Sequence, residues 1–320
     1  MDTKAPGIFR GYKFVDCATQ AYAALVGLLL LGFHNHTVPA WPWQVCAHIM
    51  LIAVIHWLVR AGSRPGVGMA LDFLRNYYPV FLYAPFFCEA GWSNRMFFPE
   101  YLDAGVIRAE QAIFGFQPSI VFMQKVPFLV VSELFYASYF SYYIMIAGVG
   151  LALFLRNRRQ FAHFISVMSF VFYVCYTIYV IVPVIGPRVL KFDYAGFTLP
   201  QDLSHVAPND PYPDAISRGS FFNVMGWIYR TFEAPGSALP SSHVAVAFCT
   251  VFFSFLYLRK IRFLHLVMAI LLSLSTVYCG YHYAIDVAAG VLTAAILVPI
   301  GNRLYSRFGE PRSESSPAKG

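Results

Sequence analysis

Charged residues are scarce in this chain: lysine, arginine, aspartate and glutamate make up 12% of its 320 residues, while hydrophobic residues make up 58%. A soluble domain usually carries about 25% charged residues. The sequence also has no linker-like break and no internal repeat, so we expect one large structural unit. These absences together argue against a soluble globular protein.

The six cysteines lack any CxxC pair and any regular spacing. Most of them stand inside apolar runs, where cysteine behaves as a small hydrophobic residue. The sequence therefore predicts neither a zinc site nor a disulfide framework.

What the chain has in excess is apolar runs, and a helix needs about 20 such residues to cross a bilayer. The pattern predicts an all-α fold, a polytopic membrane helical bundle of about eight transmembrane helices. The runs cover 20–34, 44–59, 77–92, 128–155, 161–185, 240–258, 263–281 and 283–302. The first run also fits a cleaved signal peptide, an alternative that leaves the other runs unchanged.

Basic residues should concentrate in cytoplasmic loops. With the N-terminus placed in the cytoplasm, most of the 23 lysines and arginines fall on that side, although the loops on the far side are longer. The far side holds Arg95, Arg108, Lys125, Arg188, Lys191, Arg218 and Arg230. We therefore expect both termini to be cytoplasmic. The net charge of +7 then needs no nucleic-acid partner.

Two long far-side loops carry amphipathic segments. Residues 93–127 include PEYLDAGVIRAEQAIFG, which predicts a helix on the membrane surface, and residues 186–239 include SFFNVMGWIYRTFE with apolar residues at helical spacing. The second segment fits a connector resting on the surface or a substrate lid.

Asp286 lies near the start of the last apolar run, and His282 precedes it by four residues. A carboxylate in a membrane helix costs roughly 2.5–3.5 kcal/mol at the bilayer centre, so it needs a partner or a function. At this spacing both side chains share a helix face, and the carboxylate can hold one histidine tautomer. A purely structural pair that joins helices is the alternative.

His243 stands in the segment APGSALPSSHVAVAF, where prolines give way to an apolar helix. Ser241 and Ser242 are good helix caps, and a helix N-terminus suits a phosphate. His243 is thus expected in the first turn, beside any bound anion. A helix cap with a chance histidine is the alternative.

Arg188 follows the fifth run in VIVPVIGPRVLKF, and Lys191 stands three residues later. An arginine can donate two hydrogen bonds to phosphate oxygens, although at the end of a span it is more often a membrane anchor. In an eight-span chain Arg188, His243 and His282 all reach the far side, so one site can contain them.

Glu133, inside the fourth run, is a candidate for an ion pair or a headgroup contact. The other histidines have no motif around them and are expected to pack in the core or at the interface. They are His34, His36, His48, His56, His163, His205 and His265.

These residues resemble the type 2 phosphatidic acid phosphatase superfamily of lipid phosphatases and phosphotransferases, over about residues 75–302. The middle motif of that family is matched by PSSH, ending at His243, and its last motif by Ser275, His282 and Asp286. Its first motif matches only through Arg188, because Ile181 stands at the position of the expected lysine. Thr276 replaces the arginine that usually follows the serine.

The absence of these two cations argues against a haloperoxidase. In lacking them, the sequence resembles the branch that contains the inositol phosphorylceramide synthases. The segment EQAIFGFQPS also resembles that branch. The resemblance implies a two-helix extension (1–72) and a six-helix phosphatase-like core (73–304), and the polar composition of the C-terminal segment predicts a disordered cytoplasmic tail (305–320). The resemblance implies a bacterial inner or plasma membrane protein with no metal or other cofactor, and the distribution of basic residues places its active site outside the cytoplasm.

By the same resemblance, His282 would attack phosphorus, Asp286 would orient it, and His243 would exchange the proton. Arg188, Lys191, Ser241 and Ser242 would bind the phosphate, and Glu133 could contact a headgroup. The expected partner is a phospholipid or another lipid phosphate. The predicted function is a lipid phosphotransferase that moves a headgroup such as phosphoinositol. A lipid phosphate phosphatase and, in another class, a lipid transporter or scramblase remain alternatives.

Overall fold

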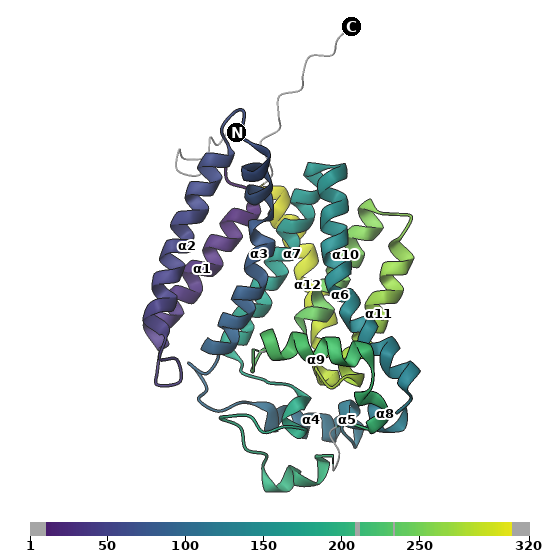
Figure 1. Ribbon diagram of the computed structural model, residues 1–320. Helices are drawn as coiled ribbons and strands as arrows, with labels where there is room; N and C mark the ends of the chain where they lie inside the picture. The colour runs from purple at the N-terminus through teal and green to yellow at the C-terminus, as the bar shows by residue number, and fades with distance from the viewer. Residues whose placement is uncertain (1–10, 209–211, 233, 309–320) are drawn as a thin grey trace.

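The computed structural model describes residues 11–208, 212–232 and 234–308. Eight long helices form a bundle, and each overlaps one of the eight apolar runs (Figure 1). They are α1 (Phe14–Phe33), α2 (Trp41–Gly62), α3 (Met69–Ser93), α6 (Leu129–Arg156), α7 (Arg158–Ile181), α10 (Ser242–Tyr257), α11 (Arg262–Tyr278) and α12 (Ala284–Arg307). Within this described part, α1, α2, α6, α7 and α12 are long and apolar enough to cross a membrane, and α10 and α11 are shorter apolar helices. The prediction of a polytopic membrane helical bundle is confirmed.

The third span differs from its prediction because α3 begins earlier, at Met69. Arg75, which precedes the predicted third run (77–92) and so falls in a predicted cytoplasmic loop, therefore lies within the helix and is 5% exposed. Its guanidinium donates to Asp16 of α1 over 2.9 Å, and Tyr78 donates to the same carboxylate over 2.6 Å. A buried arginine is tolerated in such a helix when it is paired in this way.

Helix α7 occupies the centre of the bundle and packs against α1, α3, α6, α10 and α12. Its tyrosines join distant parts of the chain. Tyr173 hydrogen-bonds with Thr19 of α1, and Tyr179 donates to the Pro240 carbonyl just before α10. The N-terminal helices are therefore packed onto the core.

Short helices gather at the end of the bundle opposite to the start of α1, which we call the site end (Figure 1). They are α4 (Asp103–Phe114), α5 (Pro118–Lys125), η2 (Pro187–Leu190), η3 (Gln201–Val206), α8 (Asp214–Ser217) and α9 (Ser220–Phe232). The two amphipathic segments of the far-side loops correspond to α4 and α9, so both are helices as predicted. Helix α9 lies across the direction of the bundle helices.

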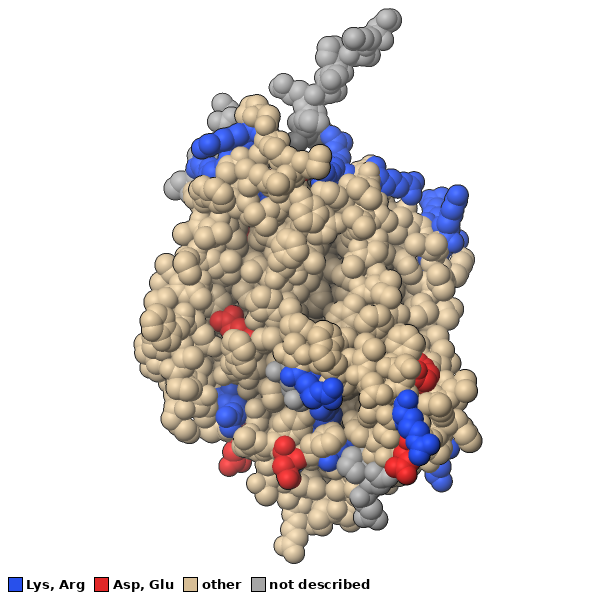
Figure 2. Space-filling view, viewed as in Figure 1, with Lys and Arg blue, Asp and Glu red and all other residues tan. Residues whose placement is uncertain are grey.

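The charges differ between the two ends of the bundle. Figure 2 shows basic side chains around the end where α12 stops, and acidic and basic side chains together at the site end. The predicted tail, 305–320, begins inside α12, which continues to Arg307, and residues 309–320 lie outside the described part of the chain.

Candidate active site

His243 occupies the first turn of α10, as the serine-rich segment predicts. Ser241 is the N-cap residue, and its hydroxyl accepts the amide of Val244 over 3.3 Å. The Ser241 amide in turn donates to the Asp286 carbonyl over 3.1 Å. A Cβ at Gly290 would lie 2.6 Å from the Ser241 carbonyl oxygen, so a glycine is needed where α10 and α12 meet.

His282 precedes α12 rather than belonging to it, because Tyr283 is the N-cap residue and the helix begins at Ala284. The expectation that His282 and Asp286 share a helix face is therefore wrong in detail. Asp286 instead folds back as the third residue of the helix, where its Oδ2 accepts the Tyr283 amide over 2.9 Å. This cap brings Oδ2 to 3.5 Å from Nδ1 of His282.

The two histidine rings face each other across the site. Nε2 of His282 lies 3.3 Å from Nδ1 of His243, and His282 is 3% exposed. When Asp286 is ionised, its carboxylate only accepts hydrogen bonds, and the proton of a neutral His282 then belongs on Nδ1, facing Asp286. The lone pair on Nε2 is then directed toward His243. Burial lowers the pKa of His282 to about 4, so that ring is neutral near pH 7.

Arg188 reaches the same site from η2. Its loop is fixed by the Val184 amide, which donates to Gly236, and by the Ala238 amide, which donates to Val184 over 2.8 Å. Gly186 has a positive φ of 106°, and a Cβ there would lie 2.8 Å from the Tyr281 carbonyl oxygen. The segments before Arg188 and before His243 are thus joined directly.

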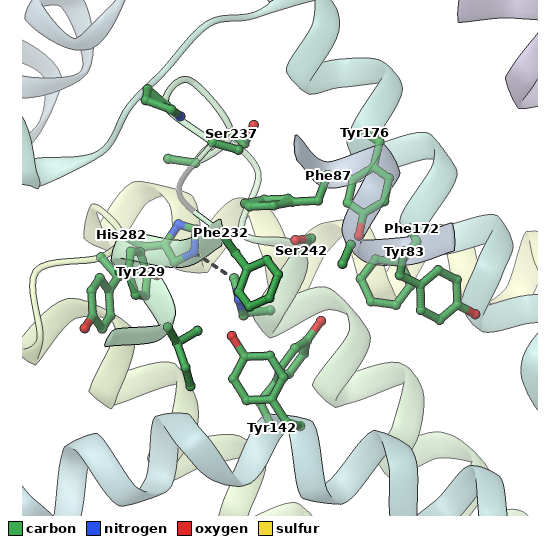
Figure 3. Close-up of a pocket in the computed structure, with 18 of the residues that line it drawn as sticks. Tyr83, Phe87, Tyr142, Phe172, Tyr176, Tyr229, Phe232, Ser237, Ser242 and His282 are labelled. Atoms are coloured by element: carbon green, nitrogen blue, oxygen red, sulfur yellow. Dashed lines mark hydrogen bonds between the residues drawn. The ribbon is translucent and has the colours of Figure 1, made fainter. Parts of the chain in front are cut away.

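A cavity of about 470 Å³ connects these residues with the interior of the bundle. Arg188, Ser242, His243 and His282 line one part of it, and Figure 3 shows His282 hydrogen-bonded there to the neighbouring histidine ring. The remainder is mainly aromatic and aliphatic and comes from α3, α6, α7, α9 and the loops at the site end. Figure 2 shows the bundle hollowed between α3 and α6. The cavity therefore has a polar part, at the histidines and Arg188, and a larger apolar part, which we call its apolar body.

The other predicted phosphate and headgroup residues lie outside the cavity lining. Ser241 is fully buried as the helix cap, and Nζ of Lys191 lies 4.4 Å from the ring centroid of Tyr212. Both Glu133 carboxylate oxygens accept the Phe221 amide over 3.1 Å, which holds the N-terminus of α9. A direct headgroup contact by Glu133 stays a prediction.

Two fully buried carboxylates of α4 stabilise the segments that carry the site residues, although they do not line the cavity. The sequence patterns did not identify this role. Asp103 accepts the amides of Ile185 and Gly186, each over 2.9 Å, and the Tyr283 hydroxyl over 3.0 Å. Glu110 accepts the amide of Ile285 over 3.2 Å. Burial raises the pKa of each carboxyl to about 7, and these hydrogen bonds oppose the shift. Helix α4 thereby connects the Arg188 loop to the start of α12.

Fold and site together describe a polytopic membrane protein with a His–His–Asp cluster at one end of its bundle, in which His282 and Asp286 are buried and His243 is half-buried. The family model described as "PAP2 superfamily" matches residues 104–300, more than half of the chain. The chain belongs to that superfamily, which confirms the resemblance at this level.

Among curated proteins, the chain is 37% identical over 60 residues to the bacitracin transport permease protein BcrC of Bacillus licheniformis. That stretch is 19% of this chain and covers 30% of the length of the relative. No solved structure matches the chain significantly.

Proposed function

We propose that this protein is a membrane lipid phosphotransferase that moves a phosphorylated headgroup, such as phosphoinositol, between lipids through a phosphohistidine at His282. The observation that carries the proposal is the contact between Nε2 of His282 and Nδ1 of His243, with Asp286 behind His282. Two facing imidazoles allow one ring to act as nucleophile while the other exchanges a proton.

In the first half-reaction, Nε2 of His282 forms a bond to phosphorus and the bond from phosphorus to the leaving lipid oxygen breaks. That oxygen takes the proton from His243 Nδ1. In the second half-reaction, the acceptor hydroxyl gives its proton to Nδ1, its oxygen bonds to phosphorus, and the N–P bond breaks. Binding of the phosphoryl group must first separate the two nitrogens, since 3.3 Å leaves no room for it.

The surroundings favour this chemistry electrostatically. Arg188 lines the same part of the cavity and supplies a positive charge for the phosphoryl oxygens. The N-terminus of α10, where His243 stands, adds oriented N–H dipoles. Asp286 balances the positive charge that develops on His282 as the N–P bond forms.

A lipid substrate fits the apolar body of the cavity. Tyr83 and Phe87 of α3 and Phe172 and Tyr176 of α7 line it beyond the histidines (Figure 3). Ala147 of α6 belongs to the lining and is also exposed, so it marks an opening toward the outside of the bundle. An acyl chain can enter there from the membrane while its phosphate reaches His282.

Transfer is favoured over hydrolysis because His282 is buried and aromatic residues of α9 stand beside both histidines, which limits the access of water. Tyr229 and Phe232 of α9 line the cavity beside the histidines. A lipid phosphate phosphatase is the second candidate, and membership of the PAP2 superfamily favours it. The name of BcrC raises transport as a third function. The clustering of candidate residues at one end of the bundle, away from its middle, argues against transport.

The direct test uses purified protein with a headgroup-labelled phosphatidylinositol and a lipid alcohol acceptor in mixed micelles. We expect the label to appear in the acceptor lipid, with little free inositol phosphate. Release of the label into water whatever the acceptor concentration would support the phosphatase instead. Lipid flux in vesicles without any turnover in detergent would support transport.

Ala147→Trp is expected to narrow the proposed entrance for the lipid. The KM for a long-chain lipid substrate should rise at least about 10-fold, the scale on which apolar pockets discriminate. Turnover of the small ester p-nitrophenyl phosphate should be unchanged. Ala152→Trp is the matched control, because Ala152 is exposed on the same helix but outside the cavity lining. Equal losses in both variants would contradict the entrance.

The basic end of the bundle indicates the orientation. We propose that the end where α12 stops faces the cytoplasm and that the site end faces outward from a bacterial plasma membrane, as the positive-inside rule suggests. Failure of a membrane-impermeant thiol reagent to label His36→Cys in intact cells, when the same reagent labels it in permeabilised cells, would contradict this orientation.

A further inference from the structure

Tyr139 of α6 contacts the His243 ring at Nε2, the ring nitrogen that does not face His282. It is fully buried, and its hydroxyl lies 3.0 Å from Nε2 of His243. The same hydroxyl lies 2.7 Å from that of Tyr229, which comes from α9. His243 is therefore enclosed between Tyr139 on one ring nitrogen and His282 on the other.

Asp286, His282, His243, Tyr139 and Tyr229 form a series of contacts, and the proton positions in this series follow from its Asp286 end. When His282 carries its proton on Nδ1, its Nε2 is an acceptor, so Nδ1 of His243 must be the donor across the 3.3 Å contact. A neutral His243 then has a lone pair on Nε2, which accepts the Tyr139 hydroxyl. Tyr139 accepts in turn from Tyr229, and each contact in the series has one donor and one acceptor.

We propose that Tyr139, supported by Tyr229, is a positioning residue that keeps the exchangeable proton of His243 on Nδ1, where the leaving oxygen collects it. As the Nδ1 proton departs, the Tyr139 proton shifts toward Nε2, so the ring does not become an isolated anion. In the second half-reaction the acceptor proton arrives on Nδ1 and the Tyr139 proton returns. The inference rests on the proposed phosphoryl transfer and deepens it.

Helix α9 becomes part of the proton path in this arrangement. The Tyr229 ring is stacked on Tyr281 at a centroid distance of 4.0 Å and an interplanar angle of 5°, and Arg188 lies 5.1 Å from its centroid. The Arg188 charge stabilises negative charge on Tyr229 while the proton of the tyrosine pair is shared with His243. The aromatic residues of α9 beside the site thus also support His243 in its role as the proton donor.

The test compares two leaving groups in Tyr139→Phe, which keeps the ring and removes the hydroxyl. With a phospholipid whose leaving group is diacylglycerol, we expect kcat to fall about 10- to 100-fold, the value of a hydrogen bond to a group that becomes charged. With the p-nitrophenyl ester of the same phosphoryl group, phosphoenzyme formation should fall less than about threefold, because nitrophenolate leaves without a proton. Tyr229→Phe should show a smaller difference in the same direction.

Tyr136→Phe is the matched control, since Tyr136 is 1% exposed on the same helix and lies outside the cavity lining. Equal losses of Tyr139→Phe with both leaving groups would indicate packing alone and overturn the inference. An unchanged kcat for the phospholipid would overturn it as well. Failure of the proposed function is distinguishable, because the wild-type protein would then form no phosphohistidine with either ester.

Discussion

His282→Ala is expected to abolish the phosphoenzyme and to lower kcat/KM for the lipid donor at least about 10⁴-fold, because removing the nucleophile removes the covalent route entirely. The structure motivates this expectation through the lone pair on Nε2, which Asp286 directs away from itself and toward His243. The measurement is a rapid acid-free quench with a ³²P-labelled donor, followed by a search for acid-labile, alkali-stable label on the protein.

His36→Ala is the control for the loss of a histidine, because His36 is exposed between α1 and α2. His243→Ala should behave differently from both variants. It should still form phosphoenzyme from a p-nitrophenyl ester, but that species should persist, since no group remains to take the acceptor proton. The double variant should lose about as much activity as His282→Ala alone, because the two rings act as one unit. Label retained on the His282→Ala protein would show that another residue is the nucleophile.

The bundle and three segments of the site could be predicted because their signals are local. A run of apolar residues predicts a span, and the serines before His243 predict the helix start at which Ser241 is found as the cap. Alternating span directions then place Arg188, His243 and His282 at one end. Each of these predictions needs only neighbouring residues and the two-sidedness of a membrane.

The supporting contacts could not be predicted, because they join residues that are far apart in the chain. Asp103 accepts from Tyr283, and Glu110 accepts from Ile285, through hydrogen bonds between α4 and the start of α12. No spacing in the sequence brings an acid of a surface helix to those groups. Tyr139 is likewise one of several tyrosines in the fourth apolar run, and nothing in its neighbouring sequence distinguishes it from the others. Glu133 was recognised as unusual, but its partner, the N-terminus of α9, appears only in the fold.

Asp286→Asn is expected to lower kcat about 10²- to 10⁴-fold, the range that includes the loss when the buried carboxylate of a serine-hydrolase triad becomes an amide. The amide oxygen can still accept the Tyr283 amide and face His282, as Oδ2 does now, so the α12 cap should be retained. What disappears is the negative charge that balances His282 as its bond to phosphorus forms. The loss should therefore appear in the rate of phosphoenzyme formation, with a small effect on KM.

The control is Asp202→Asn, because Asp202 makes an exposed ion pair with Arg108 at the same end of the protein, and such pairs contribute little. Thermal unfolding in detergent should show that both variants fold. If Asp286→Asn loses less than about tenfold in kcat, Asp286 only caps α12 and His282 acts without a charged partner. If it loses several orders of magnitude in the phosphorylation step, the carboxylate serves the fold and the reaction through the same oxygen.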